Sequence, residues 1–144
     1  MIQRRTLACT CLALTVLWFG AGACKKQQPV RLDPHSSEAV LLTLIAQGKL
    51  LSEAAARNDL KYVHDYTYYF NGLAQTLSSK LNEQQKLRLR PVFDELSTIT
   101  EQLDHASGRR HLEATQASLN QLQAKLKELE RQYREMNPSD KKPA

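Results

Sequence analysis

The residues able to perform chemistry are few in this 144-residue chain, and they separate by position. All three cysteines lie at the start: Cys9, Cys11 and Cys24. The four histidines are spread over the remainder: His35, His64, His105 and His111. Beyond Cys24 the sequence therefore contains no disulfide, no thiolate nucleophile and no cysteine metal ligand. It also contains no Gly-x-Ser-x-Gly motif, no glycine-rich phosphate loop and no Glu-x-x-His pair. We expect no enzymatic activity and no cofactor.

The histidines leave one alternative open. His105 and His111 flank a predicted turn, where two imidazoles could hold a transition metal weakly. With His64 they define a second hypothesis, a periplasmic helical bundle that binds a metal or a small ligand. A protein metal site needs three or four oriented ligands, and solvated polar residues at helix ends also explain this pattern.

Aromatic side chains are concentrated in residues 62–70, which read YVHDYTYYF. Five of the seven aromatic residues after Cys24 fall in this segment. In a helix, Tyr66 and Phe70 would lie on the buried seam, and His64 and Tyr68 would share the outer face. Tyrosines outside a core are common at binding surfaces, although packing against neighbouring helices is the alternative. We predict a partner-binding surface formed by Tyr62, His64, Tyr68 and Tyr69.

The first 23 residues have the three-part pattern of an export signal. Arg4 and Arg5 precede an uncharged, mostly apolar run over residues 7–19, and the small residues GAGA come before Cys24. The run is shorter than the roughly 20 residues that a membrane span needs, although an uncleaved anchor stays an alternative. Cleavage after Ala23 without lipidation is another alternative.

The ending Ala21-Gly22-Ala23-Cys24 resembles the lipobox of bacterial lipoproteins, which favours Leu where this chain has Ala21. The resemblance implies cleavage before Cys24 and attachment of fatty acyl chains, such as palmitate, to its thiol and new amine. Acyl chains anchor stably, since each buried methylene contributes roughly 0.8 kcal/mol. Lys25 is not the Asp associated with retention in the inner membrane, so the resemblance favours the periplasmic face of the outer membrane.

The rest of the chain divides into a lipidated cysteine and tether at 24–35, a helical domain at 36–136 and a disordered tail at 137–144. Apolar residues recur at three- and four-residue intervals in four segments, with no strand alternation. The four predicted seams are Leu41, Leu44, Gly48, Leu51 and Ala55; Val63, Tyr66, Phe70, Leu73 and Leu77; Leu89, Val92, Leu96, Ile99 and Leu103; and Leu112, Thr115, Leu119, Leu122, Leu126, Leu129, Tyr133 and Met136. Short turns near 57–59, 79–82 and 107–109 favour antiparallel neighbours. We expect an all-α, up-down-up-down antiparallel four-helix bundle.

Several residues have predicted local roles in this domain. Either Asp33-Pro34 or Ser36 can cap the first helix, the pair Asn58-Asp59 separates the first two helices and caps the second, and Asn82 with Gln85 resembles a capping box. Pro91 should kink the third helix or mark its first turn, and Gly108 should end it. Gly48 would let a neighbouring helix approach closely. The seams also suggest an internal duplication, with the first helix mapping onto the third at an offset of 48 and the second onto the fourth at 49.

One further resemblance is local. The segment His64-Asp65-x-Thr67-Tyr68 resembles a motif of uncharacterised small periplasmic helical proteins, and it implies no activity. Charge adds little: removing Arg4 and Arg5 from the 20 basic residues leaves 18 against 15 acidic ones, a net charge of +3. This mild excess and the export signal argue against nucleic acid as a partner. We therefore expect a lipid-anchored envelope protein that binds an unidentified protein partner without catalysis.

Overall fold

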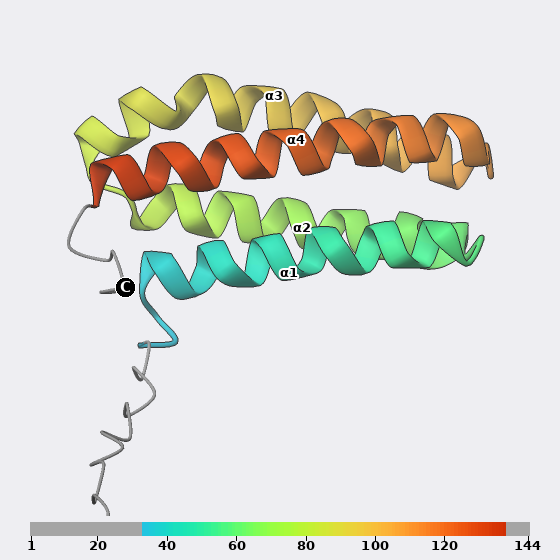
Figure 1. Cartoon of the computed structure of the whole chain (residues 1–144), viewed down its shortest axis with the longest axis horizontal. Helices are drawn as coiled ribbons and strands as arrows, with labels where there is room; N and C mark the ends of the chain where they lie inside the picture. Colours follow the sequence, from blue (N-terminus) through green and yellow to red (C-terminus); the bar gives the residue numbers. More distant parts are fainter. Residues whose placement is uncertain (1–32, 138–144) are drawn as a thin grey trace, which may run out of the picture. The chain divides into compact units, whose positions relative to one another are not determined.

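The computed structural model describes residues 33–137 (Figure 1). The predicted signal peptide at 1–23, Cys24, the first part of the tether and the tail from residue 138 lie outside the described residues. Four helices occupy the described chain: α1 (Ser37–Ala56), α2 (Leu60–Lys80), α3 (Glu83–Gly108) and α4 (Leu112–Met136). Residues 33–137 contain no strand. The predicted all-α fold with four helices is confirmed.

Side chains cap the start of every helix. The Ser36 hydroxyl oxygen accepts a hydrogen bond from the backbone N–H of Ala39, and the Asp59 carboxylate accepts one from that of Tyr62. Asn82 forms a capping box with Gln85, as the sequence predicts. The fourth cap is His111, whose Nδ1 accepts from the N–H of Ala114 at 3.2 Å. These bonds satisfy donors that the first turn of a helix leaves free.

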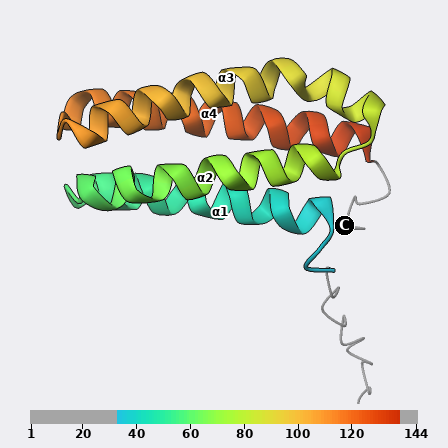
Figure 2. The same cartoon turned by 180° about the vertical axis from the view of Figure 1, so that it is seen from behind.

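Each helix packs against two others: α1 and α3 both contact α2 and α4. Figures 1 and 2 show α1 and α2 side by side, with α3 and α4 side by side next to them. At one end, the Ser37 hydroxyl lies 2.7 Å from the Tyr133 hydroxyl. At the same end, Lys80 Nζ donates to the carbonyl of His35 at 2.7 Å. These contacts bring together the start of α1 and the ends of α2 and α4.

The apolar seams meet in one core. All five predicted seam residues of α1 and all five of α3 are buried. In α4 the seam from Thr115 to Tyr133 is buried, but Leu112 at its start is exposed. Burying leucine and valine side chains contributes roughly 1.5–3 kcal/mol each, so this core supplies most of the driving force for folding.

The predicted seam of α2 is partly wrong. Tyr66 is 43% exposed and lies outside the core, whereas Thr67 is buried. The buried residues of α2 from Val63 on are Val63, Thr67, Phe70, Ala74 and Leu77, with alternating spacings of four and three residues. The predicted seam also starts at Val63 but alternates in the opposite order, three and then four. Thr67 tolerates burial because its hydroxyl donates to the carbonyl of Val63 at 2.6 Å.

One of the two alternatives for Pro91 is wrong: this residue lies inside α3 and does not mark its first turn. Gly108 is the last residue of α3, as predicted. Beyond it, Arg110 has a left-handed backbone conformation, with φ 56°, and Asn58 has the same conformation, with φ 61°, in the turn between α1 and α2.

The turn between α1 and α2 and the turn between α3 and α4 have the same backbone hydrogen bonds at a single offset of 52 residues. In the first turn, Arg57, Asn58 and Asp59 donate backbone hydrogen bonds to Glu53, Ala55 and Ala54. In the second, Arg109, Arg110 and His111 donate to His105, Ser107 and Ala106, which are the same positions plus 52. The predicted offsets of 48 and 49, and the longer second turn they imply, are wrong, because matching apolar repeats can be aligned in several registers. Under the offset of 52, α1 corresponds to α3 and α2 to α4.

Candidate functional site

The predicted partner surface on α2 is exposed but is not one patch. Tyr68 is 86% exposed and Tyr69 is 51% exposed, whereas Tyr62 is half-buried. The rings of Tyr62 and Tyr66 stack with centroids 4.1 Å apart and an interplanar angle of 17°. This stack presents the pair as one rigid apolar surface.

Contacts at the flanks of α2 show which way each side chain faces. Lys80 reaches the chain just before α1, so its flank faces α1. Residues three, four or seven apart lie on the same side of a helix. Leu73 is seven residues before Lys80, and Tyr69, Tyr66 and Tyr62 precede Leu73 at intervals of four, three and four. These residues therefore share the flank that faces α1. His64 lies on the opposite flank, because its Nδ1 lies 2.9 Å from Asp104 Oδ1 of α3. His64 and Tyr68 are four residues apart in α2 and both are exposed, so they share an outer face as expected, and His64 reaches α3 from it.

The contact between His64 and Asp104 is a helix–helix contact. Both side chains are about half exposed, and a surface pair of this kind contributes roughly 0–1 kcal/mol. The ring also packs over Gly108, where a Cβ atom would lie 3.2 Å from two ring atoms. His64 is therefore held between α2 and the end of α3.

The three histidines considered as metal ligands are not brought together. No group of three or more His, Cys, Asp or Glu side chains within residues 33–137 is arranged to hold a metal ion. His64 faces Asp104, and His111 uses Nδ1 to cap α4. His105 is exposed near the end of α3.

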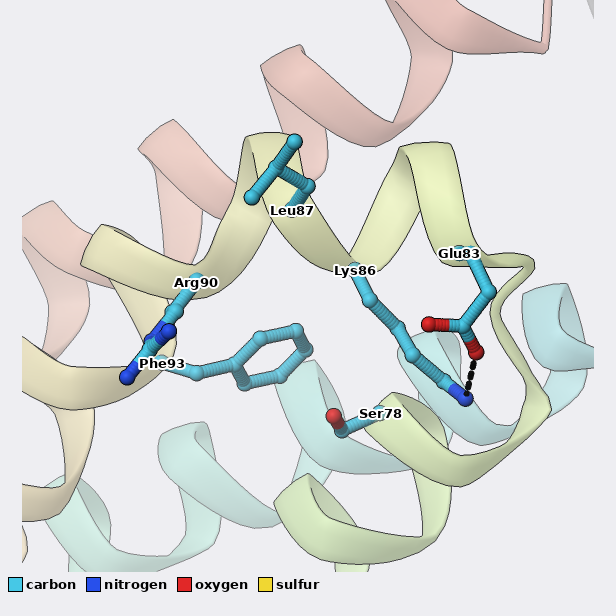
Figure 3. A pocket seen from close by; sticks show the side chains of 6 residues that line it. All are labelled: Ser78, Glu83, Lys86, Leu87, Arg90 and Phe93. Atoms are coloured by element: carbon cyan, nitrogen blue, oxygen red, sulfur yellow. Dashed lines mark hydrogen bonds and ion pairs between the residues drawn. The ribbon is translucent and has the colours of Figure 1, made fainter.

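A shallow hollow of about 280 Å³ lies between α2 and α3 (Figure 3). The ring of Phe93 projects from α3 toward Ser78 of α2, and Lys86 reaches Glu83 at 2.8 Å. The ammonium of Lys86 is thus already paired with a carboxylate. This hollow therefore has the features of an ordinary polar surface rather than those of a ligand-binding site.

A second open hollow, of about 420 Å³, lies between α3 and α4. Lys125 on its wall donates to Glu128 at 2.7 Å and also pairs with Glu95. These hydrogen bonds, first to Glu128 and then to Glu95, raise the pKa of Lys125. The same bond from Lys125 lowers the pKa of Glu128. The ammonium of Lys125 and the carboxylates of Glu95 and Glu128 are therefore paired with each other rather than left for a ligand.

The sequence does not indicate two features of α1, the helix that packs against α2. Leu50 is 44% exposed, and Gln47 is buried with its Nε2 lacking a hydrogen-bond partner. The sequence does contain a clue to the exposure of Leu50, because this leucine lies outside the predicted apolar seam of the first helix. The candidate site is thus the row of tyrosines on the α1 flank of α2, and Leu50 is the large exposed apolar residue of the neighbouring helix α1. The chain matches no protein-family model, no curated protein and no solved structure.

Proposed function

We propose that this chain is a lipid-anchored protein of the bacterial cell envelope that acts as a non-enzymatic binding module for a protein partner. The observation that carries the proposal is the row of exposed tyrosines on α2, above all Tyr69 and Tyr66. Rigid aromatic side chains offer large contact area at low entropic cost, and they are enriched among residues that dominate binding energy.

The finer architecture belongs to the same proposal. We infer an up-down-up-down antiparallel bundle over residues 36–136. Contacts at the two ends support it: Tyr133 near the end of α4 meets Ser37 at the start of α1, whereas Asp104 late in α3 meets His64 early in α2. Turns of only a few residues between consecutive helices favour the same arrangement.

The anchor is supported by the residues around Cys24. A small-residue stretch precedes this cysteine, and no cysteine follows it in the chain. A tether over 24–35 would join the acylated terminus to α1 at one end of the bundle. The sides of the helices, including the row of tyrosines on α2, would then stay accessible to partners at the periplasmic face of a membrane, with the outer membrane favoured.

Metabolic labelling with a radioactive fatty acid tests the anchor. The wild-type chain should take up label and fractionate with membranes. The Cys24→Ser variant should lose the label, because the acceptor thiol is gone. Label retained by Cys24→Ser would refute lipidation at this residue.

Photo-crosslinking in intact cells tests partner binding. The full chain would carry p-benzoylphenylalanine in place of Tyr69, with the same replacement of Gln121 as the matched control. Gln121 is exposed and corresponds to Tyr69 at the offset of 52. A protein adduct is expected from position 69 and not from position 121. Equal yields at both positions would contradict the proposed binding surface.

A further inference from the structure

Contacts between helix termini define one end of the bundle. The Ser37 hydroxyl at the start of α1 lies 2.7 Å from the Tyr133 hydroxyl near the end of α4. In the first turn of α3, Gln85 Nε2 donates to Asn137 Oδ1 at 3.0 Å. The tether at 24–35 joins the bundle at this end, before α1, and the tail follows α4 at the same end. We call it the tether end.

The net positive charge of the chain lies outside the helices. Of the 20 basic and 15 acidic residues, 13 of each fall within 36–136, so the helical domain is formally neutral. The tether and the tail together contain five basic and two acidic residues, which leaves a net charge of +3. The basic residues of these segments are Lys25, Lys26, Arg31, Lys141 and Lys142, and the acidic ones are Asp33 and Asp140. Because both segments join the tether end, the positive excess is attached to that end alone.

An exposed apolar residue lies near the same end. Leu87 is 75% exposed and lies about one turn after the start of α3, between Lys86 and Arg88. Lys86 pairs with Glu83 and Arg88 pairs with Glu135, so these two cations add no net charge. Long basic side chains cover apolar surface with their stems while their charges stay in water. A leucine flanked by such side chains is typical of segments that lie at a membrane interface.

We propose that the tether end binds the anionic phospholipid headgroups of the membrane that holds the acylated chain, with Leu87 in contact with the bilayer. This inference rests on the proposed function, because acylation of Cys24 places the tether at that surface. The tether at 24–35 spans at most roughly 40 Å when fully extended, so the tether end stays within reach of the membrane. Each Lys or Arg close to an anionic membrane surface strengthens binding about fivefold.

The opposite end of the bundle provides an internal comparison. It is formed by the two turns, which are held together where the ring of His64 packs over Gly108. Arg57, Arg109 and Arg110 lie in these turns and are exposed. The 20 residues of α1 separate the two ends by about 30 Å. Since this distance exceeds the Debye length of about 10 Å at 0.1 M salt, these arginines are screened from a surface at the tether end.

Vesicle cosedimentation tests the inference on the mature chain over residues 24–144, carrying Cys24→Ser so that no acyl group contributes. This chain should bind vesicles of phosphatidylcholine mixed with phosphatidylglycerol, and not vesicles of phosphatidylcholine alone. Its binding should weaken as salt is added. Joint replacement by Lys25→Gln, Lys26→Gln and Arg31→Gln should weaken binding about a hundredfold, because three basic residues contribute about fivefold each.

The matched control joins Arg57→Gln, Arg109→Gln and Arg110→Gln, which removes the same amount of charge at the opposite end. It should bind within about twofold of the parent chain. Leu87→Gln should weaken binding severalfold, because it removes an apolar contact with the bilayer. Leu50→Gln replaces an exposed leucine away from the tether end and should leave binding unchanged.

The outcomes separate this inference from the proposed function. Equal binding to both kinds of vesicle, binding to neither, or equal weakening in the two triple variants overturns docking through the tether end. A Leu87→Gln chain that binds no more weakly than Leu50→Gln overturns the contact with the bilayer. The fatty-acid labelling and the crosslinking at Tyr69 decide the proposed function independently, since the vesicle assay uses a chain without acyl groups and does not involve the tyrosine row.

Discussion

Gly48 should be a position where alanine destabilises the protein, although alanine is the better helix former. A Cβ atom at Gly48 would lie 2.5 Å from Leu126 Cδ1, and 3.5 Å from Gln123 Nε2. The carbonyl of Gly48 also accepts from Gln123 Nε2 at 2.8 Å, which holds α1 and α4 close together. Leu126 is buried in the core and has little freedom to move aside.

The expected magnitude is a difference between two opposing effects. Replacing glycine by alanine inside a helix stabilises by about 1 kcal/mol. Extra volume in a well-packed core costs about 1–3 kcal/mol. The net effect of Gly48→Ala should therefore be a loss of roughly 1 kcal/mol. For a domain of this size that corresponds to a fall in Tm of roughly 4–8 °C.

Gly72 supplies the matched control, because it lies inside α2 and a Cβ atom there would meet nothing within 4 Å. Gly72→Ala should raise the free energy of unfolding by about 1 kcal/mol through helix propensity alone. Thermal and urea unfolding at low protein concentration would measure both variants. A Gly48→Ala protein stabilised as much as Gly72→Ala would refute the close contact between α1 and α4.

Three further outcomes are expected. Tyr68→Ala should change the free energy of unfolding by less than about 0.5 kcal/mol in urea melts, because the ring is almost fully exposed. Tyr133→Phe should lower the free energy of unfolding by about 1 kcal/mol, because it removes the hydrogen bond to Ser37. Equal losses in the two variants would contradict these assignments. Arg110→Gly should stabilise by up to about 1 kcal/mol in the same assay, because glycine adopts positive φ freely, and Asn58→Gly should gain less. Since Lys125 lowers the pKa of Glu128 below its ordinary 4.5, this carboxylate stabilises the fold above that pH and loses the effect as pH falls below it. The Tm of Glu128→Gln should therefore fall less than that of the wild type between roughly pH 5 and pH 3, and parallel curves would contradict the assignment.

Local patterns predicted much of the fold. Seams such as Leu89 to Leu103 and the Asn82–Gln85 capping box depend on neighbours along the chain, which the sequence shows directly. The misplacement of Tyr66 has a different origin. Threonine and tyrosine at adjacent positions both fit a helical seam, and only the packing against α1 and α3 decides which one is buried.

The candidate site was less accessible from sequence. The sequence predicts a tyrosine surface on α2, but only the neighbouring helices decide that the tyrosine row faces α1 whereas His64 reaches α3. Pairing of His64 with Asp104 joins residues 40 positions apart, and no local pattern indicates it. The unpaired amide of Gln47 likewise becomes visible only when its surroundings are known.

The intact mass of the mature protein extracted from membranes tests the central claim most directly. We predict a chain that begins at Cys24 and carries acyl groups on the thiol and the terminal amine. A chain that keeps residues 1–23, or one whose Cys24 thiol is free, would contradict the account of a bundle anchored by lipid at the envelope.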